Sequence, residues 1–136
     1  MNMEVRRMNQ IDLSREVRLI IPARKDYVLV ASMTLCGLGM SAGLDMELLG
    51  DLRTVTCECV DCLLNQAGRP EQIQVSSRVE AGRLHVGFLA RERNRTQAGD
   101  SLDLDITRGV LETLMPEVQL EQDGDGVYGI ECSMPV

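Results

Sequence analysis

Residues 45–68 read DMELLGDLRTVTCECVDCLLNQAG, and this stretch decides the fold. Asp45 stands where the N-cap of a helix is expected, and Gly68, followed by Pro70, stands where such a helix should end. Apolar residues recur at spacings of three and four, which is the period of one helical face: Leu48, Leu52, Val55, Cys59 and Cys62. A polar stripe remains beside that face: Asp51, Thr54, Glu58, Asp61 and Asn65. The stretch therefore predicts an amphipathic helix with one buried side.

The flanking sequence predicts a sheet for this helix to pack on. Apolar and polar residues alternate in several short segments, which is typical of strands with one buried face. The expected elements are a strand over 17–21 closed by Pro22, a helix over about 25–37 ended by a glycine-rich stretch, a hairpin over 73–88 that turns at Ala81–Gly82, a long polar loop over 91–101, a helix over about 103–114, and a closing hairpin over 118–132 around Asp123–Gly126. This order predicts an α+β two-layer sandwich with a mixed, mostly antiparallel sheet and helices on one face.

Length and composition bound the class of protein. The 136 residues suit an arm over 1–14 and a single domain over 15–136. The net charge of −7 argues against nucleic acid and anionic membrane surfaces as partners. An odd count of five cysteines and a polar start without an apolar run predict a cytoplasmic protein with reduced thiols. The uncharged run over 27–44 approaches the length of a membrane span, but its serines and glycines favour a buried core helix.

Two strings resemble the anti-sigma regulatory serine kinases of the GHKL (histidine-kinase-like) ATPase superfamily. The run from Asp51-Leu52 through Cys57-Glu58-Cys59 to Gln66-Ala67 is similar to their "D-L-x-x-x-V-S-E-A-x-T-N-A-x-x-H" helix. The string VLETLMPEVQLEQDGDGVYGIECS over 110–133 resembles their "I-I-x-x-L-M-D-E-V" helix and closing hairpin. Together with the element order, the resemblance covers more than half of the chain and implies a bacterial regulator on the GHKL fold.

The resemblance assigns roles on the second helix residue by residue. The family's general base falls on Glu58, which is retained, and its magnesium-holding Asn falls on Cys62. A neutral thiol is a poor ligand for a hard cation that prefers oxygen. Asp61 and Asn65 repeat the same spacing further along, so Asn65 offers an alternative position for a metal ligand.

The nucleotide-binding turns of the family are also substituted. The Asp that reads adenine falls on Ala90, which cannot accept a hydrogen bond through its side chain, and the glycines that follow it fall on Glu92 and Asn94. The second glycine-rich turn falls near Asp105 and Thr107, and acidic residues crowd the place where phosphates would sit: Asp100, Asp103 and Asp105. We therefore expect weak or no ATP binding, no resident metal, and no cofactor unless the site still takes ATP with magnesium.

Other candidate residues leave alternatives open. Arg91, Arg93 and Arg95 line the loop where the family has its ATP lid, and could contact a phosphate, an acidic partner or only solvent. The pair Cys59-x-x-Cys62 lacks a second ligand pair at a zinc-like spacing, so core packing is the favoured interpretation. His85 lies on the strand face opposite Leu84, Val86 and Phe88 and is interpreted as structural or exposed.

The function expected from these observations is regulatory binding. The resemblance implies a sigma factor or an anti-sigma antagonist as protein partner, and a homodimer formed through the sheet edge and the first helix. The alternative is an ATP-dependent anti-sigma serine kinase that uses Glu58 as base.

Overall fold

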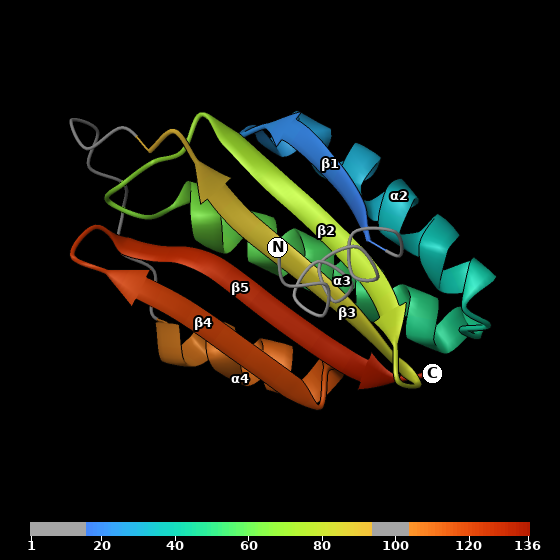
Figure 1. Ribbon diagram of the computed structural model, residues 1–136. Coiled ribbons are helices and arrows are strands. Elements are labelled where there is room, and N and C mark those ends of the chain that lie inside the picture. The colour runs from blue at the N-terminus through green and yellow to red at the C-terminus, as the bar shows by residue number, and fades with distance from the viewer. Residues whose placement is uncertain (1–15, 94–103) are drawn as a thin grey trace, which may run out of the picture.

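The computed structural model describes residues 16–93 and 104–136 (Figure 1). The described elements are β1 (Val17–Pro22), the short 3-10 helix η1 (Lys25–Tyr27), α2 (Val28–Ser41), α3 (Met46–Leu64), β2 (Gln72–Glu80), β3 (Arg83–Arg91), α4 (Leu104–Leu114), β4 (Glu117–Asp123) and β5 (Gly126–Pro135). This element order is the one expected from the sequence.

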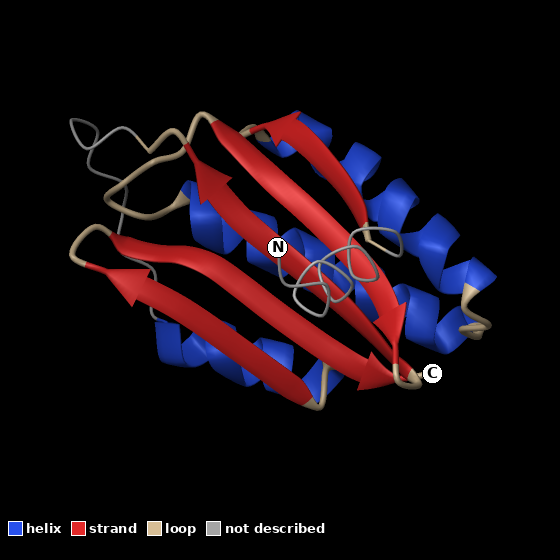
Figure 2. Ribbon diagram, viewed as in Figure 1, coloured by secondary structure: helices blue, strands red, loops and turns tan. Residues whose placement is uncertain are grey.

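The strands form one sheet in the order β1-β2-β3-β5-β4. Each neighbouring pair of these strands is antiparallel, so the described sheet has none of the parallel pairing that a mixed sheet would contain. The described α-helices α2, α3 and α4 lie behind the sheet in Figure 2, and the other face carries none of them. The predicted α+β two-layer sandwich with helices on one face is therefore confirmed.

The strand register confirms which side chains face the helices. Phe88 of β3 lies between Val75 of β2 and Ile130 of β5 in the pairing, and all three side chains are buried. His85 has the opposite parity, so it lies on the helix-free face, as its position in the alternating pattern indicated. The hairpin turn between β2 and β3 falls at Ala81 and Gly82, both with positive φ.

Helix α3 begins where its sequence predicts and ends earlier. The Asp45 carboxylate accepts a hydrogen bond from the Leu48 N–H at 2.9 Å, which makes Asp45 the N-cap. Asn65 is the C-cap, and Gly68 lies three residues beyond it, so the expected cap at Gly68 is wrong. The predicted apolar face is buried against the sheet and α2, with Leu52, Val55, Cys59 and Cys62 fully inaccessible to solvent.

Helix α2 differs from its prediction in length. It continues through Gly37 and Gly39 to Ser41, four residues past the predicted stop. Gly39 lies where α2 packs closely on its neighbours: a Cβ there would lie 3.0 Å from side-chain atoms of Leu44, just before α3, and of Leu49 in α3. A close approach between helices therefore explains this glycine better than a helix break.

The exposure of α2 also differs from the prediction of a buried core helix. Its inner face is small and buried, at Ala31, Leu35 and Gly39, whereas Leu29 and Met33 are 62% and 68% exposed. The helix thus presents an uncharged, apolar surface to solvent. Among the described helices, none has both the length and the apolar character that crossing a bilayer requires.

An apolar groove of about 350 Å³ lies at the end of the sandwich near the β2–β3 turn. The groove is bordered by the start of β1, the last turn of α2 and the β2–β3 hairpin. Its apolar lining comprises Val17, Leu38, Ala42, Val79 and Leu84.

Candidate functional site

The polar stripe of α3 carries the sequence-predicted residues Glu58, Asp61 and Asn65, and Cys62 lies next to them on the buried apolar face. Asp61, Cys62 and Asn65 follow Glu58 by three, four and seven residues, so they lie within one or two helical turns of it on neighbouring positions of the helix. Glu58, Asp61 and Asn65 are half-buried, and Cys62 is fully buried. Burial, and to a smaller degree the charge of Glu58, raises the pKa of the Cys62 thiol to about 11. Cys62 is therefore a neutral thiol at physiological pH.

Asn65 is held against the end of its own helix. Its side-chain nitrogen donates a hydrogen bond to the backbone carbonyl of Asp61 at 2.7 Å. The contact between Asp61 and Asn65 thus involves the main-chain oxygen of Asp61. It gives a hydrogen-bond donor to one of the last carbonyl groups of α3, which have no partner within the helix. The Asp61 carboxylate takes no part in it.

The remaining predicted nucleotide positions lie at the end of β3 and the start of α4. Ala90 faces the core, paired with Ile73, and is nearly buried. Asp105 is exposed in the first turn of α4, and Thr107 is buried. Helix α4 packs against α3 and β4, so Asp105 lies on a helix next to α3. Asn94, Arg95, Asp100 and Asp103 lie outside the described residues.

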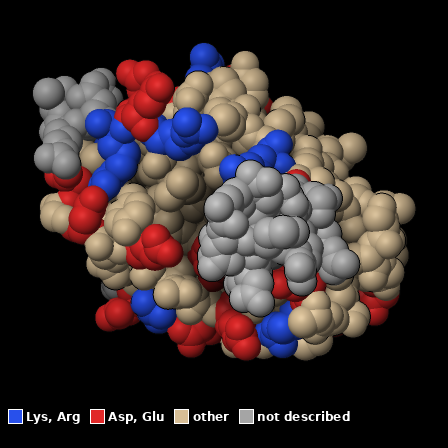
Figure 3. Space-filling view, viewed as in Figure 1, with Lys and Arg blue, Asp and Glu red and all other residues tan. Residues whose placement is uncertain are grey.

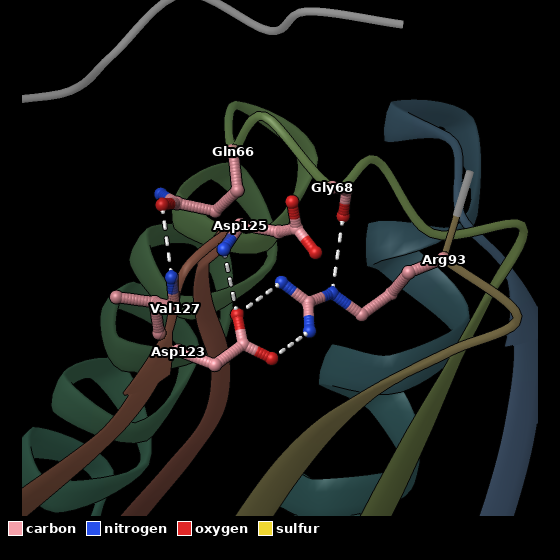
Figure 4. A network of polar contacts seen from close by, with 6 residues as sticks. All are labelled: Gln66, Gly68, Arg93, Asp123, Asp125 and Val127. Carbon is pink, nitrogen blue, oxygen red and sulfur yellow. Dashed lines mark hydrogen bonds and ion pairs between the residues drawn. The ribbon is translucent and has the colours of Figure 1, made fainter. Parts of the chain in front are cut away.

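A cluster that sequence reasoning missed closes the sandwich at the end of β3 (Figure 4). Arg93 forms a two-pronged ion pair with Asp123 at the tip of the β4–β5 hairpin, with N–O distances of 2.5 and 2.9 Å. The Nε of Arg93 is 3.4 Å from the carbonyl of Gly68, and its guanidinium carbon lies 5.5 Å from the ring centre of Tyr128. The hydrogen bond to Asp123 is the main reason that the pKa of Arg93 is raised. We name these four residues the Arg93 clamp.

Gln66 ties the end of α3 to the same hairpin. Its side-chain nitrogen donates to the Cys62 carbonyl at 2.8 Å, and its side-chain oxygen accepts from the Val127 N–H at 3.0 Å. A Cβ on Gly126 would collide with the Gln66 side-chain oxygen, and Gly126 has φ +106°. This buried amide therefore uses its polar atoms inside the fold, as Figure 4 shows.

The signals for this cluster were present in the sequence but separate. The arginines over 91–95 were assigned to phosphate, an acidic partner or solvent, and Asp123–Gly126 was assigned to a turn. The turn is confirmed, because β4 ends at Asp123 and β5 begins at Gly126. Arg93 is committed to Asp123 instead of to solvent, and Arg91 extends toward Gln74 at 3.4 Å. The two groups are 30 residues apart, and no local pattern pairs them.

The buried cysteines form part of the core, as predicted. Cys59, Cys62 and Cys132 are almost inaccessible, and burial together with a hydrogen bond to Cys132 raises the pKa of Cys59. All five cysteines are free thiols. Within residues 16–93 and 104–136, no three His, Cys, Asp or Glu side chains are grouped so as to hold a metal ion.

The donor set on α3 does not fit the magnesium of the resembled family. The position of its metal-holding Asn is a buried, neutral thiol, and magnesium requires oxygen ligands in near-octahedral geometry. Asn65, the alternative, is oriented by its bond to the helix backbone. Glu58 remains as a half-buried carboxylate capable of accepting a proton.

The architecture of the sheet and helices agrees with what a comparison with known sequences shows. The five-stranded antiparallel sheet covered on one face by three helices is consistent with a GHKL-like α+β sandwich. No protein-family model matches the chain. The chain is similar to the serine-protein kinase RsbW of Oceanobacillus iheyensis, with 25% identity over 118 residues that cover 84% of this chain and 70% of that protein.

Proposed function

We propose that this chain is a regulatory protein-binding domain of the anti-sigma type that binds ATP weakly or not at all. The observation that carries the proposal is the buried, neutral thiol of Cys62 at the position where the resembled kinases hold magnesium. Ala90 adds support, because its methyl group offers no acceptor to an adenine amino group. A domain with these residues acts by stoichiometric binding, without turnover.

The partners follow from the resemblance: a sigma factor, or an anti-sigma antagonist with a phosphoacceptor serine. The exposed apolar side of α2 supports an interaction surface, since contiguous apolar surface in a soluble protein often marks a binding site. The β1 edge strand lies beside α2 in Figure 1 and has one unpaired side in the described sheet. A homodimer through β1 and α2 would cover both features.

The alternative is an ATP-dependent anti-sigma serine kinase. The similarity to a serine-protein kinase and the half-buried Glu58 favour it. In that case Glu58 would accept the proton of the attacking serine hydroxyl, and its neighbours on the stripe would orient it. The site would need oxygen ligands other than Cys62 for the metal that accompanies ATP, with Asp61 and Asn65 as the candidates.

Isothermal calorimetry with ATP and ADP in the presence of magnesium separates the two functions. The binding module gives no heat at millimolar nucleotide, and thermal unfolding is unchanged. Micromolar binding would contradict the proposal and favour the kinase.

The substitution Glu58→Gln then tests the catalytic assignment, with Glu112→Gln on the exposed side of α4 as the matched control. A kinase loses phosphate transfer to a serine-bearing antagonist in the first variant and keeps it in the second. Equal transfer by both variants would show that Glu58 is not the base.

A further inference from the structure

The helix-free face of the sheet contains a polar hollow of about 500 Å³ that the proposed function does not use. Its floor is Gly87 in the middle of β3. A side chain there would crowd the neighbouring strand, because a Cβ on Gly87 would lie 2.8 Å from the Ser76 hydroxyl. The walls come from four strands: Ser76, Arg78, His85, Glu117, Gln119, Glu131 and Ser133. The volume is within the range of about 300–1,000 Å³ that is usual for ligand sites.

Most charges around the hollow neutralise one another within the fold. Arg78 pairs with Glu80 at 2.9 Å. Glu117 accepts a hydrogen bond from Ser133 at 3.1 Å and pairs with Arg83 at 3.4 Å. These contacts leave Arg78 and Glu117, which both line the hollow, with little free charge.

Glu131 is the exception. It lies on β5 directly opposite Gly87 on one side and Gln119 on the other, so it borders the open space above the glycine. The Glu131 side chain is exposed, and it forms no ion pair or hydrogen bond with any other described residue. The hollow therefore combines room for a side chain with one uncompensated negative charge.

The surface around the hollow also has an uneven distribution of charge. In Figure 3, Lys and Arg are concentrated along the β1 and β2 side of this face, whereas Asp and Glu predominate along the β4 side, where some Lys and Arg also lie. On the outer face of β4 and β5, the acidic residues are Glu117, Glu121 and Glu131. A positively charged segment that approaches this face is therefore drawn toward the half that contains Glu131.

We propose that this hollow is a docking site for an arginine side chain presented by a protein partner, with Glu131 as its counter-ion. A guanidinium group matches a carboxylate in a two-pronged geometry, and the side-chain oxygen of Gln119 can accept a further hydrogen bond. The inference rests on the proposed protein-binding role and names the chemistry of the partner.

A nuclear magnetic resonance titration of the full chain tests the site directly. The probe is the capped tripeptide Gly-Arg-Gly, and the control peptide carries citrulline, which has nearly the same shape without the charge. We expect the arginine peptide to bind with a millimolar dissociation constant and to shift the amide signals of Gly87, Glu131 and Ser133. Binding should weaken at high salt.

The variant Glu131→Gln should weaken binding of the arginine peptide at least fivefold. Glu121→Gln is the matched control, since Glu121 lies on the same face opposite Gly129, outside the hollow, and should change binding less than twofold. Both residues are on the sheet surface, so both variants should remain folded.

Three results would overturn the proposal: no shifts at these residues, equal binding of the citrulline peptide, or equal binding by Glu131→Gln. A Glu131-dependent change in molar mass of the protein alone would instead assign the face to a second copy of this chain, and would also overturn it. Failure of the proposed function would be seen separately, as nucleotide binding in calorimetry.

Discussion

The Arg93 clamp predicts a measurable coupling between two residues that are 30 positions apart. The test is a double-mutant cycle with Arg93→Met, which keeps an apolar stem over Tyr128, and Asp123→Asn. The asparagine retains the side-chain oxygen that accepts a hydrogen bond from the Asp125 N–H at 2.9 Å. The cycle therefore isolates the ion pair from the turn.

The magnitude follows from geometry and exposure. The pair has two charge-assisted hydrogen bonds, and the Arg93 side chain is only 15% exposed, but that of Asp123 is 41% exposed and partly screened by solvent. We place the coupling at about 1–2 kcal/mol, between the values for surface and buried pairs. Loss of the contacts with Gly68 and Tyr128 brings the total for Arg93→Met to about 2 kcal/mol.

Urea unfolding at low and high salt is the assay. Arg93→Met should lower the unfolding free energy as stated and the melting temperature by roughly 6 °C. The coupling should fall by at least half in 1 M sodium chloride. Arg91→Met is the control and should change stability by less than about 0.5 kcal/mol. A coupling below about 0.3 kcal/mol would refute the view that this ion pair holds the end of the sandwich.

Further predictions concern a turn, a thiol and the α2 surface. Ala81→Gly should stabilise the protein by about 0.5–1 kcal/mol, because Ala81 has φ +52°; an unchanged or lower melting temperature would contradict this. The pKa of Cys62 is raised from 9.0 to about 11, so the folded state holds this proton more tightly than the unfolded chain does. The resulting stability is fully present below pH 9 and is lost as pH rises through 11, a loss of about 3 kcal/mol that should be absent in Cys62→Ala; parallel pH profiles would count against it. Met33→Glu should convert the proposed homodimer into a monomer in light scattering without lowering the melting temperature, since Met33 is 68% exposed; a wild-type chain that is already monomeric would remove that proposal.

Local sequence patterns predicted the elements whose causes are local. The Asp45 cap, the alternation around Phe88 and the turn at Ala81 each depend on a few adjacent residues, and each is confirmed. The stop of α2 was misjudged because Gly39 was interpreted through helix propensity. Its actual role, close contact with Leu44 and with Leu49 of α3, depends on how the chain packs after the helix turns back.

In the candidate site, too, features with local causes were predictable and contacts between distant residues were not. Helical periodicity correctly placed Cys62 on the buried apolar face of α3 and Glu58 on the half-buried polar stripe beside it. The roles of these residues in binding or catalysis stay predictions. The Arg93 clamp and the Gln66 contact with Val127 were not predictable, because they join residues 30 and 61 positions apart through the tertiary fold.

The two ends of the sandwich are held by different kinds of force. The end at Arg93 depends on an ion pair with a largely buried arginine and on buried amide contacts. The end near the β2–β3 turn depends mainly on apolar side chains around the groove at Val17 and Leu84, because its ion pairs Arg78–Glu80 and Arg83–Glu117 are more exposed and contribute little. Salt weakens the first kind of contact and leaves the second intact, and cooling weakens the second most. The end of the sandwich that opens first should therefore depend on salt concentration and temperature. Amide hydrogen exchange should quicken first at the β4–β5 turn in concentrated salt, and first at the β2–β3 turn near 0 °C.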